Sequence, residues 1–218
     1  MKDIFKFIGI IIATYAVIML LLNVSFLEKP FNSIFRQSLE SIVKLSFPDA
    51  YIETQDFLNA KQKSDPNVFY LVYGNPEVIK AEADYAAKQN LSEYKISSYS
   101  SQFYIFQLFT VPLVFLISIF VATPIPFNKK FINLGFSILC FLVFIYFKSY
   151  LLTLFSISNS QIGIYQLNDS SMAMLSRIIS ALTLGLSIIL IFCIWLIFGF
   201  RNSVFYSQFN LYLKRFNK

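Results

Sequence analysis

The residues best suited to binding chemistry are two cations, Lys148 and Arg177, which lie at the ends of long apolar stretches. Two positive charges at one membrane surface would attract a carboxylate, a phosphate headgroup or an acidic side chain of a partner, with Asp169 as a counter-ion within the chain. Both side chains could instead extend to the lipid headgroups and only position their helices. The sequence leaves open both a site for an anionic ligand, lipid or partner and a purely structural pair.

Other kinds of site find little support in the sequence. The chain has no histidine, which removes histidine general bases and imidazole metal ligands. Its two cysteines, Cys140 and Cys193, fall inside apolar stretches, where a thiol usually packs as a small hydrophobic side chain. The sequence has neither a glycine-rich phosphate loop nor a cluster with metal-ligand spacing. We therefore expect no catalytic residues, no metal and no cofactor; whether the chain is an enzyme stays open, with the sequence leaning against it.

Four apolar stretches must position the two cations. They cover residues 7–24, 103–121, 131–152 and 178–200, each near or above the ~20 residues that cross ~30 Å of hydrocarbon. Eight of the ten basic residues outside residues 25–102 would then share one compartment. Because basic residues concentrate on the cytoplasmic side, this asymmetry predicts that both termini are cytoplasmic. Frequent Phe, Ile, Asn and Lys favour a bacterial source, so we predict a multi-pass protein of the bacterial inner membrane.

The predicted fold class is membrane all-α, with four transmembrane helices and a small α+β extracytoplasmic domain between the first and second spans. Residues 1–24 are expected to form the first span as an uncleaved signal anchor. Residues 25–102 form the extracytoplasmic amphipathic helix and α+β domain, residues 103–200 a three-helix transmembrane region, and residues 201–218 a basic amphipathic cytoplasmic tail.

Local patterns predict the elements of the extracytoplasmic segment. A helix is expected over residues 31–47, ended by Pro48. Its apolar face would lie in the outer membrane interface or pack on the domain, and would consist of Phe31, Ile34, Phe35, Leu39, Ile42 and Leu45. Strands are expected at residues 51–54, 68–73 and 94–99, with a turn over residues 63–67. A further helix, capped by Asn75 with Pro76 in its first turn, should run to about Gln89.

Three polar or special residues inside the spans have predicted structural roles. The amides Gln107 and Asn133 are expected to join helices through interhelical hydrogen bonds. Pro112 removes one backbone hydrogen bond of the second span, and a kink is the expected result. No Asp or Glu lies within any predicted span, which argues against ion-coupled transport by this chain alone.

The layout resembles the small polytopic membrane proteins that accompany exosortases, which are bacterial membrane enzymes that process sorting-tagged secreted proteins. The resemblance rests on the first span followed by an amphipathic helix that ends in Phe47-Pro48, and on a small outer domain. It also rests on the proline-containing exit of the second span, from Thr110-Val111-Pro112-Leu113 through Ala122-Thr123-Pro124, and on two closing spans with a single tryptophan, Trp195. It implies a non-catalytic companion of such an enzyme, with no functional residues to carry over.

The function predicted from these observations is that of a non-catalytic integral membrane accessory protein. Its partners would be the lipid bilayer and a membrane protein, such as a membrane-embedded processing or sorting enzyme or a secretion machine. The alternatives are a subunit of a transport complex, a membrane-surface enzyme that uses the two cations, and an envelope sensor. Nucleic acid is a poor partner, because residues 25–102 carry eight basic and ten acidic residues and the positive excess lies beside the membrane.

Overall fold

The computed structural model describes residues 2–58, 63–89, 97–204, 206 and 207. These residues form seven α-helices and one three-stranded antiparallel sheet. The chain divides into two compact units. Unit 1 contains Met1–Leu27, Gln107–Ile145 and Thr183–Lys218, and unit 2 contains Glu28–Phe106 and Tyr146–Leu182. Unit 2 therefore includes the predicted extracytoplasmic segment together with a second stretch of chain, far away in the sequence.

Among the described residues, two helices, rather than the four predicted, are long and apolar enough to cross a membrane: Ile4–Leu22 and Phe127–Asn159. The other two predicted spans correspond to shorter apolar helices, Phe106–Ala122 and Ser187–Gly199. The second predicted span is shorter because its first residues belong to a strand that ends at Tyr104. The fourth is divided, because α6 ends at Ala181 and irregular helical turns follow before α7.

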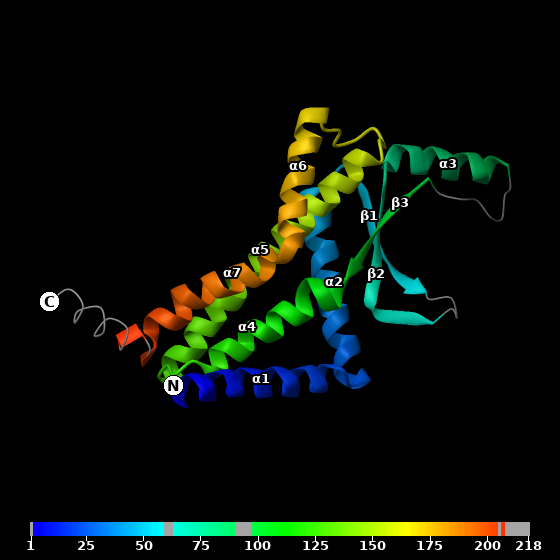
Figure 1. The fold of residues 1–218 in the computed structure, drawn as a ribbon. Coiled ribbons are helices and arrows are strands. Elements are labelled where there is room, and N and C mark those ends of the chain that lie inside the picture. The colour runs from blue at the N-terminus through cyan, green and yellow to red at the C-terminus, as the bar shows by residue number, and fades with distance from the viewer. Residues whose placement is uncertain (1, 59–62, 90–96, 205, 208–218) are drawn as a thin grey trace. The chain divides into compact units, whose positions relative to one another are not determined.

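Unit 1 is a group of apolar helices in which α4 (Val111–Ala122) packs against α1 (Lys2–Leu22) and α7 (Ser187–Ile194) (Figure 1). Aromatic rings make many of the contacts. The ring centroids of Phe115 and Phe192 lie 5.8 Å apart, and those of Phe7 and Trp195 lie 6.0 Å apart. None of the most apolar window of α1 is buried inside the structure, so its side chains are available to lipid.

A π-helical segment, Phe106–Thr110, directly precedes α4, and Pro112 lies in the first turn of α4. Proline has no N–H to continue the regular hydrogen-bond pattern, and π-turns often adjust a helix at such a position. Two more π-helical segments, Leu182–Leu186 and Trp195–Gly199, flank α7.

The sheet of unit 2 has the order β1-β2-β3, formed by Tyr51–Leu58, Ser64–Gly74 and Tyr99–Tyr104. β1 and β2 confirm the first two predicted strands and extend both, so that Ser64–Asn67, predicted as part of a turn, starts β2. The third prediction, residues 94–99, was wrong in its placement: β3 begins at Tyr99, and residues 94–96 lie outside the described part of the chain. Side chains directly opposite in antiparallel strands share a face, so Thr54 and Leu71 share a face, as do Asp56 and Phe69.

Two helices of unit 2 follow from local signals. α2 covers Ser25–Ser46, and α3 covers Pro76–Lys88. The side chain of Asn75 accepts a hydrogen bond from the backbone N–H of Glu77 at 3.0 Å, which confirms the predicted cap. α2 begins six residues before its predicted start and contains Pro30 within its first two turns.

The remaining part of unit 2 comes from the end of α5 (Phe127–Asn159) and from α6 (Asp169–Ala181). α5 is longer than predicted at both ends, and at about 1.5 Å per residue its 33 residues extend about 50 Å. The loop after it contacts the domain: Tyr165 packs edge-on against Phe47 at 5.2 Å, and Asn75 donates a hydrogen bond to the carbonyl of Ile162 at 3.1 Å. The hydroxyl of Tyr73 lies 2.9 Å from that of Ser160. These contacts explain why residues 146–182 belong to the same unit as the sheet.

Candidate functional site

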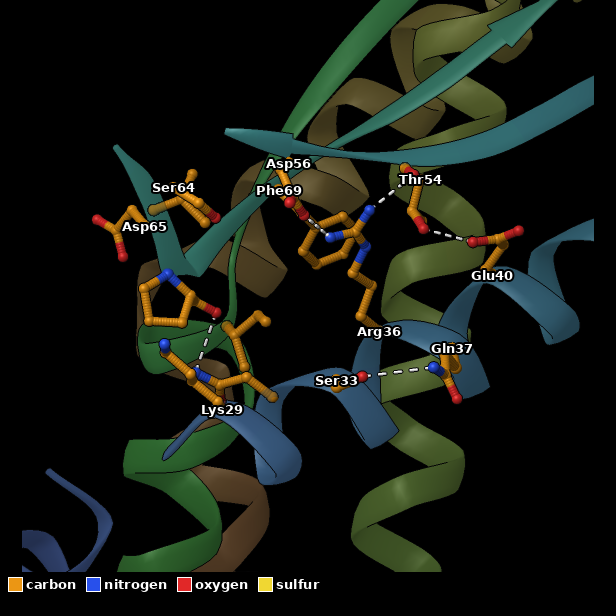
Figure 2. Close-up of a pocket in the computed structure, with 14 residues that line it drawn as sticks. Lys29, Ser33, Arg36, Gln37, Glu40, Thr54, Asp56, Ser64, Asp65 and Phe69 are labelled. Carbon is orange, nitrogen blue, oxygen red and sulfur yellow. Dashed lines mark hydrogen bonds and ion pairs between the residues drawn. The ribbon is translucent and has the colours of Figure 1, made fainter. Parts of the chain in front are cut away.

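A cavity of about 560 Å³ opens in unit 2 between α2 and the sheet (Figure 2). One wall comes from residues 29–40 of α2, and the facing wall comes from β1 and from the start of β2. Its lining residues are Lys29, Asn32, Ser33, Arg36, Gln37, Glu40, Thr54, Asp56, Ser64, Asp65, Pro66, Val68, Phe69 and Ile105. Most of them are polar, and both signs of charge are present.

The spacing of residues along α2 explains why its polar side chains reach this cavity. Phe35, Leu39 and Val43 recur every four residues and are buried within the unit. The neighbouring face of the helix carries Ser33, Arg36 and Gln37, and the cavity lies along that face. Burial of the apolar stripe therefore fixes the rotation of α2, and that rotation directs the polar stripe toward the sheet.

Arg36 is the central side chain of the cavity. Its Nη1 forms an ion pair with Asp56, and its Nη2 donates a hydrogen bond to the backbone carbonyl of Thr54 at 2.7 Å. The guanidinium carbon also lies 5.9 Å from the ring centroid of Phe69, within the range of a cation–π contact. Figure 2 shows the side chain reaching from α2 to the two β1 residues across the Phe69 ring. Three contacts of different kinds hold one cation at this position.

Glu40 forms the other end of the same wall. It accepts hydrogen bonds from the hydroxyl of Thr54 and from the ammonium of Lys44, the latter at 2.6 Å. Partial burial opposes ionisation of Glu40, but these hydrogen bonds outweigh it and hold the pKa of Glu40 below its ordinary value. Glu40 is therefore a carboxylate at neutral pH and serves as a hydrogen-bond acceptor.

A set of amide contacts closes the opposite end of the cavity. Asn32 is 4% exposed and donates hydrogen bonds to the carbonyl of Pro66 at 3.0 Å and to the side-chain oxygen of Asn67 at 3.1 Å. Asn67 donates in turn to Glu28 at 2.5 Å. Asp65 accepts from the backbone N–H of Asn67 at 2.9 Å, which stabilises the turn-like start of β2. These contacts join the first turns of α2 to β2.

Two groups on the cavity rim retain capacity for a ligand. Lys29 is exposed, and within the described residues its ammonium makes no hydrogen bond or ion pair. Asp65 uses one oxygen to cap its own turn, which leaves the second oxygen available. A positive and a negative group thus lie on one rim, beside an apolar floor that includes Phe69 and Ile105.

The structure places the sequence-predicted cations in unit 2, in different settings. Lys148 is 9% exposed within α5, on the helix face opposite Tyr146 and Tyr150 by helical spacing. Arg177 is exposed on α6, and Asp169 is exposed at the first position of that helix. Among the described residues, no hydrogen bond or ion pair joins these three side chains, so the predicted site stays a prediction.

The predicted polar contacts of the spans have different positions. Asn133 donates a hydrogen bond to the carbonyl of Phe198 at 2.9 Å and so joins α5 to the π-helical segment Trp195–Gly199. Gln107 is exposed, and its side chain makes no hydrogen bond within the described part of the chain. Most of the predicted amphipathic tail, residues 201–218, falls outside the described residues, since residues 205 and 208–218 are not among them.

Sequence reasoning missed the α2 cavity, although one signal was present. The pattern that predicted the helix over residues 31–47 used only its apolar positions, and the polar residues between them received no role. The signal was the concentration of Asn32, Ser33, Arg36, Gln37 and Glu40 on one helix face. Their partners on the sheet could not be identified, because they lie 14 to 35 residues away in the chain.

Comparisons of this chain with protein-family models, with curated proteins and with solved structures find no match.

Proposed function

We propose that the chain is a non-catalytic accessory protein of the bacterial inner membrane, and that unit 2 binds a polar segment of a partner protein in the α2 cavity. The observation that carries the proposal is the wall of this cavity, which combines both signs of charge with amide donors and acceptors above an apolar floor. A volume of about 560 Å³ is within the range of small-ligand sites and is sufficient for a few residues of extended peptide.

The proposed topology has four membrane crossings, cytoplasmic termini, and residues 25–102 outside. The apolar character of both long helices and both shorter ones supports it, and further helical turns flank Ser187–Gly199 at both ends. The sorting of basic residues supports the orientation. The length of α5 also fits, since about 50 Å of helix exceeds the roughly 30 Å of hydrocarbon and leaves its last turns outside.

The charges of the cavity favour binding over catalysis. Arg36 is engaged by Asp56 and by a backbone carbonyl, and Glu40 is held as a carboxylate by Lys44 and Thr54. A general acid needs a pKa near the working pH, whereas the pKa of Glu40 is displaced in the opposite direction. Such paired groups hold the shape of the wall, and Lys29 and Asp65 on the rim can then contact a ligand.

The ligand chemistry that fits best is a peptide segment carrying both an acidic and a basic group. Its acidic group would pair with Lys29, its basic group with Asp65, and its backbone with amide groups such as that of Gln37. A membrane-anchored unit of this kind would hold a segment of a membrane or secreted protein close to a membrane-embedded processing or sorting enzyme, or to a secretion machine.

Photo-crosslinking in native membranes tests this proposal. A photoreactive residue at Gln37, inside the cavity, should capture one discrete partner, whereas the same residue at Lys80, exposed on α3, should not. Asp65→Lys should abolish this capture, and the matched change Asp84→Lys on α3 should leave it intact. Equal capture from both positions, or capture that persists in Asp65→Lys, would contradict the proposal.

A further inference from the structure

α2 carries a third face, which is apolar and exposed. Leu27, Ile34 and Leu45 are 40%, 66% and 82% exposed, respectively. With Ser38 and Ser41 they follow one line along the helix, at spacings of three, four or seven residues. This line is distinct from the buried stripe of Phe35, Leu39 and Val43, which packs inside unit 2.

The two serines in this line do not make it strongly polar. The hydroxyl of Ser38 donates to the carbonyl of Ile34 at 2.8 Å, and that of Ser41 donates to the carbonyl of Gln37 at 2.9 Å. Because each hydroxyl is bonded back to its own helix, neither requires a water molecule as acceptor. The line from Leu27 to Leu45 therefore behaves as a mainly apolar surface about five turns long.

The apolar line points away from the sheet. Arg36 and Asn32 both reach β1 or β2, and Ile34 lies two residues from each, about 160° around the helix. The sheet thus covers one side of α2, while the apolar line occupies the opposite side.

Contacts inside unit 2 determine how α2 crosses α5. The Phe35 ring lies 6.4 Å from that of Tyr146, and the Phe47 ring lies 5.1 Å from that of Tyr150. Between these contacts the chain advances about 18 Å along α2 but only about 6 Å along α5. Within unit 2, α2 therefore crosses the end of α5 steeply.

The crossing lies at the level where α5 would leave a bilayer. About 20 residues of helix cross the roughly 30 Å of hydrocarbon in a bilayer. Counted from Phe127 at the start of α5, this length ends at about residue 146. α2 also starts at Ser25, three residues after α1 ends at Leu22. Both connections put α2 at the membrane surface, across the direction of α5.

We infer that α2 is an in-plane helix of the outer membrane interface, with Ile34 and Leu45 inserted among the lipid acyl chains. This inference rests on the membrane assignment of α1 and α5 but not on ligand binding in the cavity. The insertion fixes unit 2 at the bilayer surface, with its sheet and cavity on the side of α2 away from the lipid. A steeply crossing helix with one apolar side turned away from its domain has the geometry of an interfacial helix.

Depth measurements on the full-length protein in liposomes test the inference. Cys140 and Cys193 are first replaced by alanine, and single cysteines are introduced at Ile34, Leu45, Ser33 or Ile12 for labelling with an environment-sensitive fluorophore. The liposomes contain phosphatidylethanolamine and phosphatidylglycerol, with a nitroxide quencher attached to the acyl chain either near the headgroup, for the α2 labels, or near the chain end, for the label at Ile12. Ser33 is exposed on the cavity side of α2, and Ile12 is 63% exposed in α1.

Labels at Ile34 and Leu45 should be quenched several-fold more strongly than the label at Ser33. Equal weak quenching at all three α2 positions, with strong quenching at Ile12, overturns the interfacial assignment and leaves the cavity proposal unaffected. Weak quenching with water-protected labels at Ile34 and Leu45 also overturns it, in favour of a second copy of the chain on this face. Absent quenching at Ile12 overturns the membrane assignment itself.

Discussion

The contacts that stabilise the inside of unit 1 differ in kind from those that stabilise the inside of unit 2. In unit 1, aromatic and aliphatic side chains make most contacts, and three side-chain hydrogen bonds join neighbouring helical segments: Trp195 to Thr123, Asn133 to Phe198, and Lys130 to Val121. In unit 2, charged and amide side chains connect α2 to the sheet. Helices that are surrounded by lipid gain little from burying apolar surface, because lipid tails are as apolar as the helix surfaces. Their association therefore depends on how closely their side chains fit together.

This difference implies that the stability of unit 1 should depend on side-chain volume and not on pH, whereas the stability of unit 2 should also depend on pH. Four substitutions or conditions test that contrast, beginning with the largest expected effect.

Gly199→Ala should be the most damaging change. A Cβ at this position would lie 2.5 Å from Trp195 Cδ1 and 3.4 Å from Phe120 Cζ. Trp195 cannot move easily, since its ring contacts Phe7 and its Nε1 donates to Thr123 at 2.8 Å. We expect a loss of about 1–3 kcal/mol, typical of overpacking, measured as a lower midpoint of thermal unfolding in detergent micelles.

Gly135→Ala is the matched control, because nothing lies within 4 Å of its Cβ position on α5. It should leave the midpoint unchanged or raise it slightly, since alanine favours the helix by about 0.5–1 kcal/mol. Equal losses from both glycine changes would show that fit around Trp195 is not what holds unit 1.

Thr123→Val should have the next largest effect. The change removes the acceptor of the Trp195 indole N–H at an almost constant volume, in a site where Thr123 is fully buried. We expect a loss of about 1–2 kcal/mol, within the range of interhelical hydrogen bonds in membranes.

Thr153→Val provides the comparison, because Thr153 is equally buried but its hydroxyl donates only to Ser149 of its own helix. The midpoint of thermal unfolding of Thr153→Val should stay closer to that of the wild type than the midpoint of Thr123→Val does. If both threonine changes lower the midpoint equally, the interhelical bond contributes nothing specific.

Arg36→Gln should destabilise unit 2 by about 1 kcal/mol, since it removes a charge-assisted hydrogen bond whose strength water partly reduces. Asp56, its ion-pair partner, is 58% exposed, which limits the contribution of that pair. Hydrogen exchange of the β1 amides reports the loss locally, and the unit 1 amides should not change. Lys44→Gln, which breaks an exposed pair within α2, should cost only about 0.3–0.5 kcal/mol.

Acid should loosen unit 2 through Glu40. Its pKa is lowered in the folded state, so its contribution is fully present above the unfolded value of about 4.3 and is lost as the pH falls through the folded pKa. The protection factors of the β1 amides, which correct hydrogen exchange for its intrinsic dependence on pH, should therefore fall in that window. Glu40→Gln and Thr54→Val should each flatten this part of the pH profile, and a steep profile in Glu40→Gln would assign the acid sensitivity to another group.

Local sequence signals were sufficient for several elements. Asn75-Pro76 predicted the start of α3 because a cap and a first-turn proline act on adjacent residues. The β-branched and aromatic run at residues 68–73 predicted the centre of β2 for a similar reason. In contrast, the placement of β3 was missed, since Phe103 reads as the first residue of an apolar stretch but pairs with Phe69 in the sheet.

The cavity could not be predicted from the same signals. Arg36 meets Asp56 twenty residues away, and Asn32 meets Pro66 thirty-four residues away. The sequence showed that polar residues share a face of α2, but the facing wall depends on strand pairing. It also depends on which apolar stripe of α2 is buried: Phe35 and Leu39 are buried, whereas Ile34 and Leu45, placed on the same predicted face, are exposed.

The amino-acid sequence by itself determined the long apolar stretches, the sorting of the basic residues and the caps of individual helices, because each of these depends on neighbouring residues or on composition. Only the tertiary structure decided that α6, together with the last turns of α5, belongs with the sheet. It also decided that α2 has three distinct faces, and that Arg36 rather than Lys148 is held by several partners. These features depend on contacts between residues far apart in the chain, and such contacts form only when burial of apolar surface fixes the rotation and register of each element.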